Sequence, residues 1–238
     1  LGFYILLTSL KAGRLPALAG ALAYGFSTYL IIIIQAGHNS KAYALGYLVM
    51  VIAGVLMAYR YDRRKGALLF TVALALEILV GHIQITYYGL LALLVFGITE
   101  LVYALREKRS LPFLKTTGWL VAGALLAVAV NFSYLYSNYK FSKETIRGKS
   151  ELTHNSENQT SGLDKDYVVQ WSQGISETMT LLIPGYMGGS HTTSPGQDSE
   201  SYRILRERGV ENPRQALGSV ILYHGEKPYT SGPYYAGA

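Results

Sequence analysis

Apolar segments separated by short polar loops fill the first 135 residues, and the loops alternate in charge. The turns around His38 and His82 contain a single basic residue, Lys41. The three loops that alternate with these turns are rich in basic residues. The first contains Lys11 and Arg14, the second Arg60, Arg63, Arg64 and Lys65, and the third Arg106, Lys108, Arg109 and Lys115. Because short loops rich in Lys and Arg stay on the cytoplasmic side of a membrane, this alternation predicts a multi-pass membrane protein.

The apolar segments have the length of membrane spans, for which about 20 residues are needed. We expect spans at 1–10, 16–36, 42–59, 66–81, 83–105 and 116–135. The first of these is only part of a span. The span at 66–81 has 16 residues, which cover about 24 Å and fall short of the ~30 Å hydrocarbon core. We therefore expect it to end below the outer surface or to line a water-filled recess.

Charge divides the chain into two regions. Residues 1–135 contain 11 Lys/Arg and 4 Asp/Glu, a net charge of +7, whereas residues 136–238 contain 10 and 11, a net charge of −1. The isoelectric point of about 9.3 therefore reflects membrane topology and excludes a nucleic-acid binder, which would place its basic excess on a soluble face. The absence of cysteine excludes disulfides and thiolate chemistry.

The polar region 136–238 follows a span that leads away from the basic side, so we expect it to be extracytoplasmic, α-rich and loop-rich. Its beginning, 136–149, is an expected extension of the last span. Short helices are expected at 164–173, 176–183, 201–208 and 213–223, with caps at Ser176 and Asn212. The chain begins within an apolar segment and ends without a closing element, so we expect it to be an internal part of a longer protein.

The two turns opposite the basic loops share one character, a Gly-His pair followed by amide or hydroxyl groups. Polar groups at membrane depth are costly unless they pair or face water, and helix N-termini offer N–H groups to anions. We therefore expect a phosphate or sugar-phosphate site there, and the alternative is that these turns are interfacial helix caps. The candidate residues are His38, Asn39, Lys41, His82, Gln84 and Tyr88.

Two carboxylates lie within the apolar segments. Glu77 lies about one helical turn below the outer end of its span, where a carboxylate must be paired, protonated or next to a cavity. We expect a polar intramembrane role, in which Glu77 holds His82 or Lys41 or acts as a base. Glu100 lies near the cytoplasmic end, and snorkelling or pairing with Arg106 would explain it.

In the polar region, Arg147 and Lys149 are candidates to bind an anionic group on the acceptor side, where Trp171 could stack on a sugar. The alternative is an ordinary solvated surface with core aromatic residues. The histidines of this region, at 154, 191 and 224, are scattered. No metal site is therefore assigned. No cofactor is assigned either, and a divalent metal ion in the longer protein stays an open alternative.

Several of these segments resemble one family. They are QAGHNSKA at 35–42, GHIQITYY at 81–88, IRGKSEL at 146–152, SGLDKDY at 161–167, LLIP at 181–184 and YTSGP at 229–233. Together they resemble the YfhO family of bacterial multi-pass membrane proteins, with the character of its Bacteroidetes branch. The resemblance covers nearly the whole chain, in order.

The resemblance implies a mainly α transmembrane bundle like that of the GT-C glycosyltransferases, in the bacterial cytoplasmic (inner) membrane. Such enzymes transfer a sugar from a polyprenyl-phosphate carrier to a cell-envelope polymer or glycolipid on the extracytoplasmic side. Their catalytic acidic residue usually lies in the first extracytoplasmic loop. We expect that loop to lie outside this chain, so no catalytic residue is assigned here.

Three functions follow as hypotheses. In the first, the protein is a glycosyltransferase whose two histidine turns bind the carrier phosphate. In the second, it is a transporter or flippase of a lipid-linked or anionic solute, for which the short span and Glu77 would form a midplane site. In the third, it is a non-catalytic assembly subunit of a membrane complex. Covalent attachment of the sugar to an acceptor distinguishes the first from the second.

Overall fold

The computed structural model describes residues 1–143, 169, 172, 174–189, 194–218, 220, 222–224 and 235. The chain forms two compact units, Leu1–Ser142 and Lys143–Ala238. The described residues are mainly helical and contain no strand, apart from an isolated bridge between Gly188 and Tyr223. The prediction of a mainly α protein is therefore confirmed.

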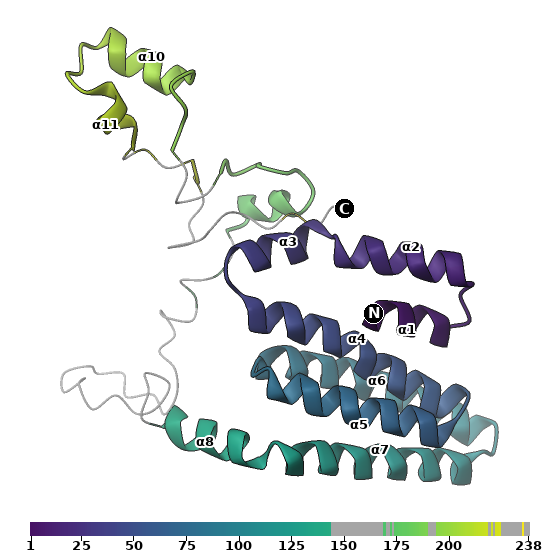
Figure 1. Cartoon of the computed structure of the whole chain (residues 1–238). Coiled ribbons are helices and arrows are strands. Elements are labelled where there is room, and N and C mark those ends of the chain that lie inside the picture. The colour runs from purple at the N-terminus through teal and green to yellow at the C-terminus, as the bar shows by residue number, and fades with distance from the viewer. Residues whose placement is uncertain are drawn as a thin grey trace. The chain divides into compact units, whose positions relative to one another are not determined.

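The first unit is a bundle of helices (Figure 1). Their bounds are α1 Gly2–Ser9, α2 Arg14–Gly25, α3 Thr28–Gln35, α4 Asn39–Arg60, α5 Arg63–Leu79, α6 Ile83–Arg106, α7 Ser110–Val130 and α8 Phe132–Ser142. Four segments in the described part of the chain are long and apolar enough to cross a membrane, namely Arg14–Gln35, Asn39–Arg60, Ile83–Arg106 and Ser110–Val130. These features are those of a membrane protein.

The segment expected as one span at 16–36 is divided into α2 and α3. The helix is interrupted at Phe26 and Ser27, and Ser27 has an extended ψ of 141°. The carbonyl of Ser27 accepts the first hydrogen bond of α3, from the N–H of Ile31 at 3.2 Å. Serine favours such cap positions over helix interiors, so the interruption has a local cause.

Helix α5 packs against α4, α6 and α7. Its buried side chains join those of α4 and α7 in the hydrophobic core. Small residues bring α4 and α5 close together, because a Cβ atom on Gly66 would lie 2.2 Å from the backbone nitrogen of Ala58, and one on Gly54 would lie 2.5 Å from that of Phe70. Such close contacts between small residues are typical of packed membrane helices.

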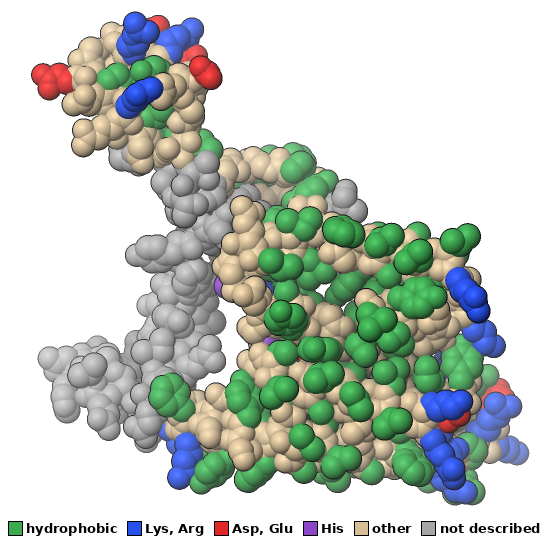
Figure 2. All heavy atoms as spheres, in the orientation of Figure 1, with side chains coloured by type: hydrophobic (Ala, Val, Ile, Leu, Met, Phe, Trp, Pro, Cys, Tyr) green, Lys and Arg blue, Asp and Glu red, His purple; other side chains and the backbone are tan. Residues whose placement is uncertain are grey.

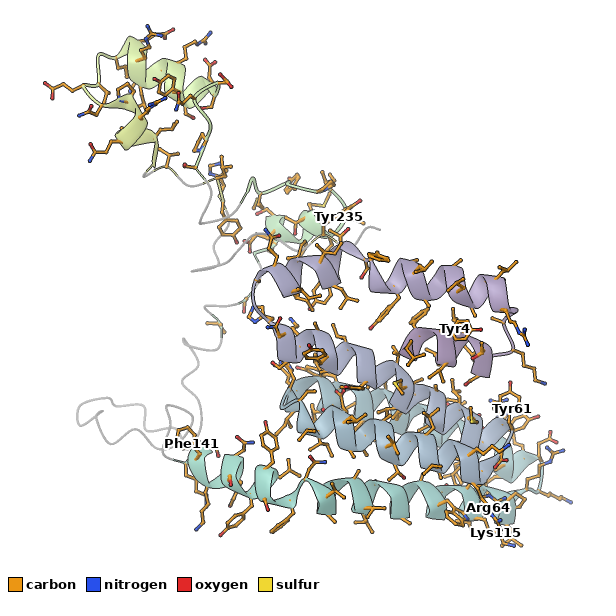
Figure 3. The ribbon with its side chains drawn as sticks, in the orientation of Figure 1. Tyr4, Tyr61, Arg64, Lys115, Phe141 and Tyr235 are labelled. Carbon is orange, nitrogen blue, oxygen red and sulfur yellow. The ribbon has the colours of Figure 1, made fainter. Side chains whose placement is uncertain are left out.

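The two ends of the bundle differ in charge. The α1–α2, α4–α5 and α6–α7 turns lie at one end, here called the basic end, and the α3–α4 and α5–α6 turns lie at the other, here called the histidine end. Figure 3 shows Arg64 and Lys115 at the basic end, and most of the Lys and Arg side chains of the bundle in view in Figure 2 gather there. The alternation of loop charge along the sequence thus becomes a difference between two ends.

The outer surface of the bundle is apolar between these ends (Figure 2). Large hydrophobic side chains point outward from α2, α6 and α7, for example Leu94 and Leu125, with 59% and 67% of their surface exposed. A water-soluble protein rarely exposes so many contiguous apolar side chains. An apolar outer surface of this kind is suited to contact with the acyl chains of lipids.

The second unit contains the 3₁₀ helix η1 Ser176–Leu181 and the helices α10 Glu200–Glu207 and α11 Pro213–Gly218. The helix expected at 176–183 is the 3₁₀ helix η1. Its N-cap is Ile175, so Ser176, the expected cap, is the first residue of η1. α10 begins after Ser199, whose hydroxyl accepts the N–H of Tyr202, and α11 ends five residues before the expected boundary at 223. The helix expected at 164–173 lies outside the described residues, apart from 169 and 172.

In the second unit, Glu177 forms hydrogen bonds to residues that are distant from one another in the sequence. Its carboxylate is buried and accepts hydrogen bonds from the backbone N–H of Gly174 at 2.6 Å and from the hydroxyl of Tyr223. Residues 222–224 pair with residues 187–189, where the N–H of Gly189 donates to the carbonyl of Leu222 and the N–H of His224 to that of Met187, both at 2.9 Å. These bonds fix a small polar core in this unit.

Candidate functional site

The two turns of the histidine end have nearly the same backbone. Gly37 and Gly81 adopt positive φ angles of 79° and 78°, and the histidines that follow them have ψ angles of 54° and 63°. Glycine is favoured here because a Cβ atom is strained at positive φ. The Gly-His repeat in the sequence therefore corresponds to a repeated way of ending one helix and starting the next.

Each turn leads directly into a long helix, α4 after His38 and α6 after His82. Neither histidine side chain caps the helix that follows it. The first N–H groups of a helix have no partner within the helix, and they carry partial positive charge. Two helix N-termini of this kind at one end of the bundle are suited to an anionic ligand.

Lys41 and the two histidines differ in exposure. His38 and Asn39 are exposed, whereas Lys41 is half-buried, with its ammonium nitrogen 5.4 Å from the ring centroid of Tyr29. His82 is half-buried, and its Nδ1 atom is buried with no hydrogen-bond partner among the described residues. A buried polar atom without a partner is uncommon, so His82 has capacity for a further hydrogen bond.

Glu77 lies fully buried beneath the second turn. Its Oε1 accepts a hydrogen bond from the hydroxyl of Thr86 at 3.2 Å, and its Oε2 has no partner in the described part of the chain. The described contacts join Glu77 to Thr86, and none of them joins it to His82 or Lys41, the partners expected from the sequence. Thr86 was not among the candidate residues. Its hydroxyl within an apolar segment, one turn after His82, marked it as a polar residue but did not identify it as the partner of Glu77.

The structure does not bring Gln84 and Tyr88 together with Thr86. They lie four residues apart on an exposed face of α6, while Thr86 faces the interior. The ring of Tyr88 contacts that of Tyr87, with 5.6 Å between the centroids. Gln84 and Tyr88 therefore belong to a surface next to the turns.

Two residues that the sequence analysis did not select hold the histidine end in place. Asn131 ends α7, and its side-chain amide donates to the carbonyls of Ala75 at 3.0 Å and Ala127 at 2.9 Å. Tyr134 of α8 lies against the second turn, since a Cβ atom on Gly81 would be 2.2 Å from its hydroxyl oxygen. A polar residue at the end of an apolar segment was the available signal for Asn131.

The expected pairing of Glu100 with Arg106 is wrong. Glu100 is nearly buried, and its carboxylate forms an ion pair with Arg60 of α4. Arg60 comes from the neighbouring helix, and sequence spacing alone does not identify a partner on another helix.

The candidate acceptor-side residues Arg147, Lys149 and Trp171 lie outside the described residues, as do His154 and His191. Among the residues that the structure does describe, no three His, Asp or Glu side chains come close enough to hold a metal ion. Comparison of this chain with protein-family models, curated proteins and solved structures found no match.

Proposed function

We propose that this chain is part of a GT-C-like membrane glycosyltransferase of the YfhO type and that its histidine end binds a polyprenyl-phosphate-linked sugar. In this proposal the bundle lies in a bacterial cytoplasmic membrane, with the basic end in the cytoplasm. The histidine end and residues 143–238 then lie on the extracytoplasmic side. The acceptor is a cell-envelope polymer or glycolipid.

The observation that carries the proposal is the repeated Gly-His turn. The two turns open α4 and α6 at the same end of the bundle, and neither helix is capped by a side chain. Lys41 adds positive charge beside the first turn, and His82 adds an unused hydrogen-bonding atom beside the second. Positive helix ends together with donor side chains are the chemistry that binds phosphate.

In the proposed reaction, an acceptor hydroxyl attacks the anomeric carbon of the sugar. The bond between that carbon and the phosphate oxygen breaks, and the acceptor proton passes to a base that is not assigned in this chain. Negative charge grows on the departing lipid phosphate. Lys41, His38 and His82 would stabilise this charge, as fixed donors do in oxyanion sites. Gln84 and Tyr88 would help to orient the phosphate or the sugar.

Binding can be tested without catalysis, by photo-crosslinking the chain in lipid nanodiscs to a polyprenyl phosphate that carries a diazirine group. We expect crosslinks in the peptides that contain His38 and His82, and lower yields in Lys41→Gln and His82→Ala. Arg64→Gln is the matched control, because it removes a charge from the opposite end. Equal yields in all variants, or crosslinks confined to other peptides, would contradict the proposal.

A transporter of a lipid-linked or anionic solute is the second candidate. The observation that favours it is Glu77, which is fully buried among helices and has one carboxylate oxygen without a described partner. Buried ionisable groups within membrane bundles often mark solute or proton pathways. Under this function a labelled sugar would cross the membrane and remain on its carrier.

A further inference from the structure

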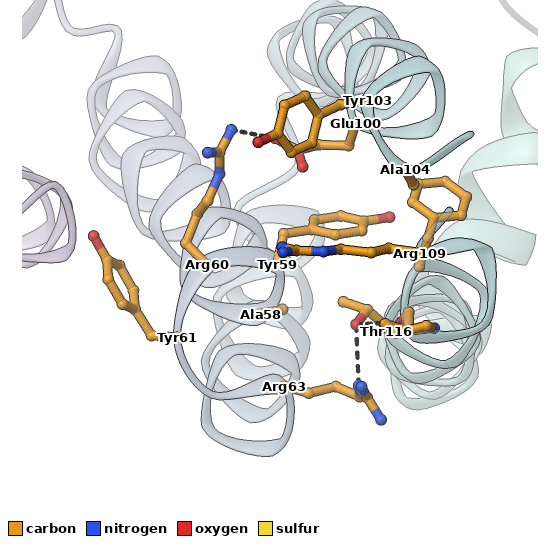
Figure 4. A pocket seen from close by; sticks show the side chains of 12 residues that line it. Ala58, Tyr59, Arg60, Tyr61, Arg63, Glu100, Tyr103, Ala104, Arg109 and Thr116 are labelled. Carbon is orange, nitrogen blue, oxygen red and sulfur yellow. Dashed lines mark hydrogen bonds and ion pairs between the residues drawn. The ribbon is translucent and has the colours of Figure 1, made fainter. Parts of the chain in front are cut away.

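A cavity lies at the basic end, opposite the histidine turns (Figure 4). It has a volume of about 390 Å³ and is lined by the C-terminal ends of α4 and α6 and by the N-terminal starts of α5 and α7. Three arginines, Arg60, Arg63 and Arg109, contribute to its wall, together with Glu100. Volumes of this size are typical of sites for small ligands.

The cavity carries an excess of positive charge. Arg60 is neutralised by its ion pair with Glu100. The guanidinium of Arg63 uses only its Nε in the described structure, donating to the hydroxyl of Thr116 at 3.0 Å. The side chain of Arg109 has no hydrogen bond or ion pair among the described residues, and only its backbone is hydrogen-bonded. In Figure 4 the side chain of Arg109 extends from the α6–α7 turn toward α4. Two guanidinium groups are therefore available in one cavity, where an anion would offset their mutual repulsion.

An apolar cavity adjoins this one and shares Arg63 with it. Its volume is about 410 Å³, and Gly118, Trp119 and Ala122 of α7 line it together with Arg63 and Lys115. Trp119 has 49% of its surface exposed. Arg63 thus lies where a charged cavity meets an apolar groove on the outside of a helix. A free phosphate ion would use only the first of these, whereas a lipid would use both.

We propose that the arginine cavity binds the phosphate headgroup of an anionic phospholipid and that an acyl chain of the same lipid lies along the groove at Gly118 and Trp119. Arg63 and Arg109 donate to the phosphate oxygens, and guanidinium groups suit phosphate because their N–H donors form paired bonds. Basic pockets between membrane helices bind lipid headgroups in this way. The inference is independent of the proposed function, because the two sites lie at opposite ends of the bundle.

Native mass spectrometry of the full chain, released from detergent micelles with either phosphatidylglycerol or phosphatidylcholine, tests the proposal. We expect phosphatidylglycerol to be retained and phosphatidylcholine to be lost. Arg109→Gln should weaken retention about tenfold, the usual effect of losing a charge-assisted hydrogen bond. Arg64→Gln removes an equal charge at the same end without lining the cavity, so it should leave retention unchanged. Equal losses in Arg109→Gln and Arg64→Gln would overturn the proposal in favour of unspecific attraction.

A second variant tests the lipid chain separately from the phosphate. A Cβ atom on Gly118 would have no atom within 4 Å, so Gly118→Leu should fold and place its side chain in the groove. We expect Gly118→Leu to reduce retention of phosphatidylglycerol several-fold while circular dichroism and the elution volume stay as in the unaltered protein. Unchanged retention in this variant, or displacement of the lipid by millimolar inorganic phosphate, would identify a free-phosphate site and overturn the lipid assignment.

Discussion

Replacing Gly81 with alanine should destabilise the bundle more than the same change at Gly37. Both glycines have a φ angle close to 79°, so alanine at either position costs about 1–2 kcal/mol of backbone strain. At Gly37 the new methyl group would have no atom within 4 Å, but at Gly81 it would lie 2.2 Å from the hydroxyl oxygen of Tyr134. Overpacking of this kind adds about 1–3 kcal/mol. Gly81→Ala should therefore cost about 2–5 kcal/mol in total.

A double-mutant cycle with Tyr134→Phe isolates the contact with Tyr134. Phenylalanine lacks the hydroxyl oxygen, and the next ring atom would lie 3.3 Å from the new methyl group, a distance that a small shift relieves. In the Tyr134→Phe background, Gly81→Ala should therefore cost no more than Gly37→Ala. The assay is unfolding by SDS in mixed micelles, followed by far-ultraviolet circular dichroism. Equal costs for Gly81→Ala and Gly37→Ala in the unaltered background would show that the hydroxyl of Tyr134 does not oppose a methyl group at position 81.

Three further predictions concern the bundle and its turns. Gly66→Ala should lower the free energy of unfolding by about 1–3 kcal/mol, because the new methyl group would overpack against α4. Gly97→Ala is the control, because a Cβ atom there has open space, and it should raise the free energy of unfolding by about 0.5–1 kcal/mol. The same SDS titration measures both. Asn131→Ala removes the hydrogen bond that joins the end of α7 to the carbonyl of Ala75 in α5 and should cost about 0.5–1.5 kcal/mol in the same titration. Asp62 caps α5, and the backbone N–H groups of Lys65 and then Arg64 hold the pKa of its carboxyl below the ordinary value of 3.8. The contribution of Asp62 to the free energy of unfolding is therefore present above pH 3.8 and is lost as the pH falls through the lower pKa of the folded state. An acid titration of stability should show this loss in the unaltered protein and not in Asp62→Asn, whose side chain does not titrate.

The features that follow from local sequence were accessible to prediction. Apolar segments of span length gave the helical character, and the alternating loop charge gave the two different ends of the bundle. The glycines at 37 and 81 adopt the left-handed conformation that the Gly-His turns indicated. Each of these depends on neighbouring residues or on a repeated pattern, so no knowledge of helix packing was needed.

The features that depend on which helix faces become neighbours were not accessible. Glu77 accepts a hydrogen bond from Thr86 of the next helix, and Glu100 of α6 pairs with Arg60 of α4, a residue 40 positions earlier in the sequence. Hydropathy places such residues at a depth in the bundle but does not assign their partners. The arginine cavity was missed for the same reason, because its lining comes from four helices and the basic loops were interpreted only as topology signals.

We propose that the histidine end serves transfer of a sugar from a polyprenyl-phosphate carrier. The most direct test is transfer from a labelled polyprenyl-phosphate sugar in bacterial membranes that contain the protein, with an empty-vector control. We expect label in a polymer or glycolipid, and less of it in His38→Ala and His82→Ala at unchanged expression. Label that crosses the membrane but stays on the carrier would instead indicate a transporter, and transfer that both variants leave unchanged would show that the histidine end does not bind the donor.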